Sequence, residues 1–173
     1  ACRVVADLGV RVIALKFVAP FCDHDLLARP QEYTREMGHK YGLEVALVDR
    51  SEGYLDMLDR PAHGFGKHFN PCIDCKILML TRARQCMAAY NASFLVTGEV
   101  LGQRPMSQRR DTLRVIERDS GCEDILLRPL SARLMRPTRP EREGLIQREQ
   151  LLAISGRSRR QQKALAASRG IVD

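Results

Sequence analysis

The sequence lacks any apolar run close to the roughly 20 residues that a helix needs to span a bilayer. It also shows no charged segment followed by an apolar stretch and a cleavage site, the pattern of a secretory leader. Only six of its 173 residues are cysteine, and their spacing does not suggest a disulfide-stapled secreted scaffold. We therefore expect a cytoplasmic protein without a membrane segment, whose reduced thiols serve metal binding, catalysis or packing.

Internal repeats and low-complexity tracts are also absent, and 45% apolar with 28% charged residues is the composition of one globular domain with a real core. Charge is unevenly placed. Residues 1–102 hold 12 Lys+Arg and 12 Asp+Glu, whereas residues 103–173 hold 16 and 9, so the second segment carries the whole net charge of +7. Clustered, arginine-rich positive charge favours phosphate or nucleic acid as a partner, although a solvated basic surface has the same composition.

Strand-length apolar runs alternate with helix-length segments along most of the chain. The predicted strands are "VRVIALKFV", "LEVALVD", "SFLVTGE" and "DILLRPL", and the predicted helices are "ACRVVADLG", Gln31 to Tyr41 closed by Gly42, "NPCIDCKILMLTRARQCMAAYN" and "SQRRDTLRVIERDSG". This alternation is typical of an α/β fold with a doubly wound, mostly parallel sheet and helices on both faces. We expect residues 1–135 to form that domain. Residues 136–173 should be a basic extension of it, with an irregular start and short helices around "QREQLLAI" and "SRRQQKALAAS".

The stretch "HFNPCIDCK" places two cysteines three residues apart at a predicted helix start. With Asn70 as cap and Pro71 in the first turn, Cys72 and Cys75 lie one turn apart on the same face. The helix dipole and the adjacent Lys76 favour the thiolate form, which is nucleophilic and binds metals.

Several interpretations of this cysteine pair can be compared. A zinc knuckle would need a second CxxC or HxxxH pair, which the sequence does not supply. A thioredoxin-type dithiol has a proline between its cysteines, whereas Pro71 lies before this pair. A nucleophilic thiol pair, an incomplete iron–sulfur site and two packed cysteines remain open. Among the other cysteines, Cys86 and Cys2 are interpreted as packing residues. Cys22 and Cys122 lie next to strands and are weaker site candidates.

The stretch "FLVTGEVLGQ" ends a predicted strand at Gly98, where a ligand can approach the backbone closely. The loop and helix that follow add donors suited to phosphate oxygens, namely Gln103, Arg104, Gln108, Arg109 and Arg110. A solvated helix face would explain the arginines equally well.

Two segments resemble known tRNA-modifying enzymes. "LVTGEVLGQRPMSQRRDTLRVI" followed by "ILLRPLSA" resembles the adenylating domain of tRNA 4-thiouridine sulfurtransferases, and "NPCIDCKILML" resembles the segment with the catalytic cysteine in tRNA 2-thiouridylases. The resemblance covers about residues 8–170. It implies an adenine-nucleotide alpha-hydrolase (PP-loop ATPase) fold. It also implies an enzyme that uses ATP and Mg²⁺ to adenylate a tRNA uridine carbonyl and then replaces the oxygen with sulfur from a persulfide-carrying protein or sulfide.

The resemblance also assigns roles to residues. Cys75 falls on the catalytic cysteine, and Cys72 stands where cluster-dependent relatives have the first cysteine of a CxxC, so both are candidate iron–sulfur ligands. The implied nucleotide contacts are Lys16 and Phe17 along the adenine, with Lys76, Gly98 and Gln108. The arginine-rich half would contact tRNA phosphates through Arg104, Arg109, Arg110, Arg157, Arg159 and Arg160.

The family's pyrophosphate loop, Ser-Gly-Gly-x-Asp-Ser, would precede the first helix, and the sequence does not contain it. We therefore expect a fragment that is inactive alone and a thiolating enzyme in the complete protein. The alternatives are another ATPase of the same superfamily, which amidates or desulfurates a small substrate, and a non-enzymatic RNA-binding module. The sequence makes no prediction of the oligomeric state.

Overall fold

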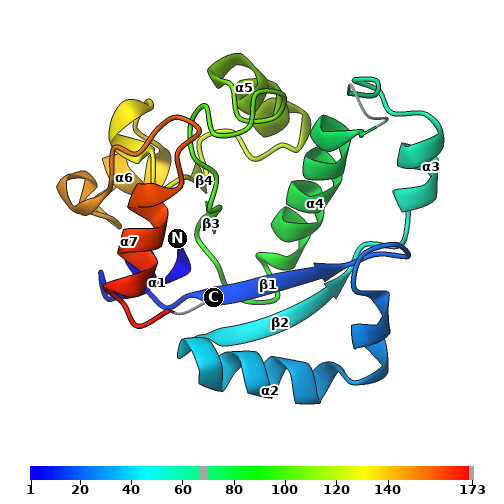
Figure 1. The fold of residues 1–173 in the computed structure, drawn as a ribbon, viewed down its shortest axis with the longest axis horizontal. Coiled ribbons are helices and arrows are strands. Elements are labelled where there is room, and N and C mark those ends of the chain that lie inside the picture. Colours follow the sequence, from blue (N-terminus) through cyan, green and yellow to red (C-terminus); the bar gives the residue numbers. More distant parts are fainter. Residues whose placement is uncertain (67–69, 172–173) are drawn as a thin grey trace.

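The computed structural model describes residues 1–66 and 70–171. Its strands are β1 (Ile13–Val18), β2 (Glu44–Asp49), β3 (Leu95–Val96) and β4 (Leu126–Leu127). Its α-helices are α1 (Cys2–Ala6), α2 (Pro30–Tyr41), α3 (Tyr54–Asp59), α4 (Cys72–Cys86), α5 (Arg110–Asp119), α6 (Arg139–Arg142) and α7 (Arg160–Ala167), as Figure 1 shows. Short 3-10 helices are η1 (His24–Ala28), η2 (Ala132–Leu134) and η3 (Arg148–Gln150). The structure thus has the mixed α and β content that the sequence predicts.

Both strand pairs are parallel. β1 pairs with β2 from Ile13 opposite Glu44 to Val18 opposite Asp49, and β3 pairs with β4 over two residue pairs. α2 connects the first pair and α5 the second, so each pair with its helix is a β-α-β unit. The four predicted strands and their parallel direction are confirmed.

The strands form two separate two-stranded sheets, which differs from the single continuous sheet that the alternation predicts. Strands pair only where their backbones lie about 4.8 Å apart, and within the described residues no ladder joins β1 to β3. In Figure 1, β1 and β2 run along the lower part of the molecule, and β3 and β4 lie above them beside α4 and α5. The described structure is therefore a mixed fold with two small parallel sheets.

The apolar core surrounds the short pair β3–β4. Leu127 of β4 shares one buried cluster with Val5 of α1, and the neighbouring Leu126 shares another with Leu80 of α4 and Ile116 of α5. Alternate residues of a strand face opposite sides, so β4 packs against helices on both faces. This packing fixes α4 and α5 beside the carboxyl end of β3.

Helix α4 begins one residue later than the sequence predicts. Its first residue is Cys72, Pro71 occupies the cap position, and no side chain caps the helix, so Asn70 does not act as the cap. Pro71 instead contributes its carbonyl, which accepts a hydrogen bond from the Cys75 N–H at 2.9 Å. The predicted spacing survives this correction, because Cys72 and Cys75 still lie one turn apart.

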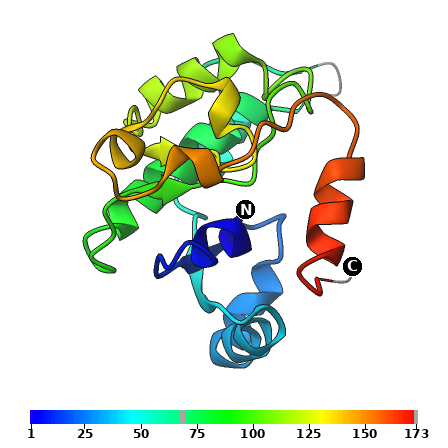
Figure 2. The same cartoon turned by 90° about the vertical axis from the view of Figure 1, so that its left-hand side faces the viewer.

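The chain after β4 is more ordered than its Pro- and Arg-rich sequence predicts. Glu141 accepts hydrogen bonds from Thr138 N and Oγ1, both at 2.7 Å, and this capping box starts α6. Ile146 and Leu151 are buried in the same cluster as Leu127. Figure 2 shows α7, in red, at one edge of the molecule. None of the described helices combines the length and apolar character needed to cross a membrane.

Candidate functional site

The cysteine pair lies against an arginine that sequence reasoning did not single out. Arg50 directly follows β2, and its backbone N–H extends the ladder to the Val18 carbonyl at 3.0 Å. Its side chain is buried, and Nη1 lies 3.0 Å from Cys75 Sγ and 3.3 Å from the Cys75 carbonyl oxygen. A cationic donor beside a half-buried sulfur at a helix start is the kind of surrounding that reactive cysteines have.

An aromatic side chain completes this site. The Arg50 guanidinium carbon lies 5.0 Å from the ring centroid of Tyr54, which is within cation–π distance. The Tyr54 hydroxyl lies 3.9 Å from Cys22 Sγ, and burial, followed by this contact, raises the pKa of the phenol. The Phe21 ring is tilted against Tyr54 at 6.4 Å between centroids, and Phe21 itself is 72% exposed. Tyr54 thus contacts both Arg50 and Cys22, which was a weaker site candidate from the sequence.

The start of α4 is held in place by Asp74, one of the two residues between Cys72 and Cys75. His63 donates its backbone N–H to Asp74 Oδ2 at 3.1 Å, and its Nδ1 lies 2.9 Å from Asp74 Oδ1. The second ring nitrogen lies 3.0 Å from Asp119 at the end of α5. The hydrogen bond with Asp74 raises the pKa of His63 above its usual value. One imidazole therefore ties α4 to α5 and limits how far the cysteines can move.

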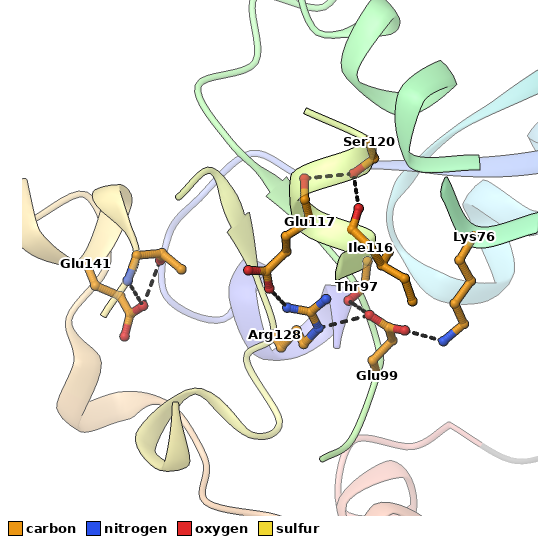
Figure 3. Close-up of polar contacts among 9 residues, drawn as sticks. Lys76, Thr97, Glu99, Ile116, Glu117, Ser120, Arg128 and Glu141 are labelled. Carbon is orange, nitrogen blue, oxygen red and sulfur yellow. Dashed lines mark hydrogen bonds and ion pairs between the residues drawn. The ribbon is translucent and has the colours of Figure 1, made fainter. Parts of the chain in front are cut away.

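A chain of ion pairs lies on the other side of α4 (Figure 3). Lys76 is paired with Glu99, which also accepts a hydrogen bond from Arg128 Nε at 2.9 Å, and Arg128 is paired with Glu117. Burial would raise the pKa of Glu99, but Arg128 and then Lys76 outweigh it, so this pKa lies below its usual value. The Arg128 side chain is 1% exposed. Lys76, predicted to contact a nucleotide, is therefore neutralised within the protein.

The other predicted nucleotide contacts are placed as follows. Lys16 in β1 is ion-paired with Asp23, and Phe17 beside it is half-buried. Gln108 is buried, and its Oε1 accepts the backbone N–H four residues earlier at 3.1 Å, whereas Gly98 is exposed. Among the described residues no hydrogen bond or ion pair joins Lys16, Lys76 or Gln108 to one another. Their role as nucleotide contacts stays a prediction.

The iron–sulfur prediction can be compared with the side chains around the pair. Cys72 and Cys75 are both half-buried free thiols. Across residues 1–66 and 70–171, no three His, Cys, Asp or Glu side chains converge as a metal site. Iron–sulfur clusters are held by three or four cysteines in most proteins, so this pair supplies part of a ligand set. A cluster role for Cys72 and Cys75 stays a prediction.

The remaining cysteines are placed largely as sequence reasoning suggests. Cys122 is fully buried, its Sγ lies 3.6 Å from the Leu80 carbonyl oxygen, and burial raises its pKa, which makes it a packing residue. Cys86 and Cys2 are half-buried rather than fully buried.

The predicted RNA-binding arginines fall into two groups. Arg109 and Arg110 lie at the start of α5, Arg104 lies in the loop before it, and all three are exposed. Arg109 is paired with Asp111 at 3.1 Å, and Arg110 donates to the Leu134 carbonyl at 3.0 Å. The second group, Arg157, Arg159 and Arg160, is exposed at and before the start of α7, and these residues have no ion pair with any described residue.

Arg50 and Tyr54 are the site residues that sequence reasoning missed. One signal was present, because Arg50 is the first residue after β2, and ligands of parallel sheets collect at the carboxyl ends of strands. Tyr54 gave no such signal, since it starts a short helix that the sequence did not predict. Comparisons of the chain with protein-family models, with curated proteins and with solved structures give no match.

Proposed function

We propose that this chain belongs to an ATP-dependent tRNA sulfurtransferase and that Cys75 is the thiol that handles the sulfur. The observation that carries the proposal is the contact of the buried Arg50 guanidinium with Cys75 Sγ at 3.0 Å. Only a thiolate attacks sulfur or carbon efficiently, and an adjacent guanidinium stabilises that form. Cys72 on the same helical face supplies a second thiol.

The chemistry can be written with the chain's own residues. ATP, when bound, would supply activation of the uridine carbonyl, whose oxygen then leaves with AMP. Cys75 attacks the outer sulfur of a donor persulfide: a new S–S bond forms at Cys75, the donor's S–S bond breaks, and the donor leaves as a thiolate. The outer sulfur on Cys75 then forms a bond to the activated carbon. Cys72 attacks the Cys75 sulfur and frees the thiocarbonyl, and an external dithiol reduces the resulting disulfide.

The basic half of the chain supports tRNA rather than a small molecule as substrate. Half of the 16 lysines and arginines after residue 102 have no hydrogen bond or ion pair from their side chains to a described residue: Arg104, Arg114, Arg133, Arg136, Arg157, Arg159, Arg160 and Lys163. Such unpaired cations are available to phosphate oxygens. In the complete protein we also expect β1–β2 and β3–β4 to belong to one doubly wound sheet. A structure of that protein with the pairs still separate would contradict this expectation.

The test is the thiouridine content of tRNA in cells that express variants of the complete protein. Cys75→Ser should abolish the modified nucleoside, because serine keeps the size of cysteine but is a far weaker nucleophile. Cys72→Ser should be comparably severe if both thiols are required and milder if Cys72 only supports its neighbour. Cys86→Ser at the far end of α4 is the matched control and should affect stability alone. Thiouridine at wild-type levels in the Cys75→Ser strain would refute the assignment.

A further inference from the structure

Two hollows on the surface share the side chains of Arg110 and Arg114. The larger, about 550 Å³, lies at the start of α5 and reaches Leu101 and Gly102. The smaller, about 90 Å³, lies between α5, β4 and the segment from Ala132 to Glu141, which includes Arg136. In Figure 1, β4 lies between α5 and α6, and residues of all three elements line the smaller hollow. We call the two hollows the arginine groove and define it by Arg110, Arg114 and Arg136.

The charge of the groove is not balanced by its own acids. Every acidic side chain that lines it has an arginine partner: Asp111 with Arg109, Glu117 with Arg128, and Glu141 with Arg148. Arg114 and Arg136 have no ion pair with any described residue. Arg110 uses one nitrogen, Nη2, on the Leu134 carbonyl. Three guanidinium groups therefore face the groove without a counter-ion from the described protein.

The three arginines are exposed, and two of them belong to one helix, whereas Arg136 lies in the segment between η2 and α6. Arg110 and Arg114 lie one turn apart on α5, so their side chains start about 6 Å apart. The contact from Arg110 to Leu134 joins the first turn of α5 to η2. Arg109 provides no side-chain cap, so the first N–H groups of α5 add further donors at this end. An extended ligand with several phosphates fits this arrangement better than a single small anion does.

We propose that the arginine groove binds the phosphate backbone of an RNA strand, with Arg110, Arg114 and Arg136 each contacting a phosphate. The inference rests on the proposed function, because it locates the tRNA that this function requires. Guanidinium groups bind phosphate oxygens through paired, charge-assisted hydrogen bonds. Such contacts position the nucleic acid without reading its sequence. The groove thus assigns roles to Arg114 and Arg136, which sequence reasoning did not name.

The test measures binding of a fluorescently labelled, unmodified tRNA transcript to the 173-residue chain by anisotropy at several salt concentrations. In the triple variant R110Q/R114Q/R136Q, the slope of log K against log salt should fall by about 2 to 3 units, since each phosphate contact contributes about 0.7 to 0.9. If both proteins converge near 1 M salt, this loss corresponds to at least roughly 100-fold weaker binding at 0.1 M. R110K/R114K/R136K keeps the charges and should keep the slope.

The matched control is R11Q/R29Q/R35Q, which removes the same charge from three exposed arginines at β1 and α2. It should change the slope by less than about one unit. An unchanged slope in the groove variant would overturn the inference. So would an equal loss in the control or the lysine variant, or displacement of the tRNA by micromolar inorganic tripolyphosphate. Absence of tRNA binding at low salt would also overturn it.

This assay needs neither ATP nor a sulfur donor, so its outcome is independent of the thiolation test. Suppose that Cys75→Ser abolishes thiouridine synthesis but the triple groove variant keeps the parent's slope of log K against log salt. This result would refute the groove proposal alone. Conversely, if tRNA binding depends on the groove arginines while Cys75→Ser thiolates normally, the groove proposal is supported and the proposed sulfur chemistry is refuted. Circular dichroism and thermal melting confirm that each triple variant is folded.

Discussion

Replacing Arg50 with methionine should slow the alkylation of Cys75 while the chain stays folded. Arg50 Nη1 lies 3.0 Å from Cys75 Sγ, and Arg50 is only 7% exposed. Two unit charges about 4 Å apart attract by about 4 kcal/mol at an effective dielectric constant near 20, and desolvation of the pair offsets much of this. A remaining 1.4 kcal/mol of stabilisation of the attacking sulfur, about one third, corresponds to a factor of about ten in the rate of its reaction. We expect about a tenfold lower rate at neutral pH.

The stability of this variant should change little. Methionine loses the hydrogen bond to the Cys75 carbonyl and the cation–π contact with Tyr54, each worth about 1 kcal/mol. It also removes a buried Nε that has no hydrogen-bond partner among the described residues. These effects oppose each other, and we expect a loss of at most about 2 kcal/mol in urea unfolding.

The assay is iodoacetamide labelling in a Cys72→Ser background, with the alkylated Cys75 peptide quantified by mass spectrometry over time. Arg82→Met is the control, because Arg82 lies two turns further along α4 and is paired with Glu52. Its labelling rate should match that of the parent. A rate within twofold of the parent for folded Arg50→Met would refute the reasoning that the guanidinium activates the Cys75 sulfur.

Three further predictions concern the surroundings of the site. The pKa of His63 is raised by its contact with Asp74, so the stability from the charged imidazole should be complete below about pH 6.5 and lost as pH rises through the folded-state pKa. Urea unfolding should show this loss in the parent and not in His63→Gln. Glu99→Gln should lower the free energy of unfolding by about 3 to 5 kcal/mol, because it removes the carboxylate paired with the partly buried Lys76 and one of the two paired with the buried Arg128. The exposed Glu52→Gln should cost under about 1 kcal/mol, and equal urea midpoints for the two variants would contradict this account. Calorimetric titration of Mg-ATP into the 173-residue chain should show no micromolar binding, because Lys76 is paired with Glu99, and micromolar binding would show that these donors open to the nucleotide.

Local sequence patterns were sufficient to predict most of the secondary structure. The β-branched runs predicted β1 and β2, and Gly42 ends α2 with a φ of +61°, a conformation that glycine adopts without strain. The pattern was less informative where tertiary contacts determine the structure. α3 is too short to show a clear helical period, and α6 depends on the capping contacts of Thr138 rather than on apolar spacing.

The sequence by itself determined that the molecule mixes helices with parallel strands, that Cys72 and Cys75 share a helical face, and that the second half is basic. These properties depend on neighbouring residues or on composition alone. Only the tertiary structure decided that the strands pair as two separate sheets and that Arg50 lies against Cys75 although 25 residues separate them. It also decided that Lys76 is neutralised by Glu99. The reason is physical: which side chains meet depends on how β2, α4 and β3 pack together, and the periodicity of one segment carries no information about its partner.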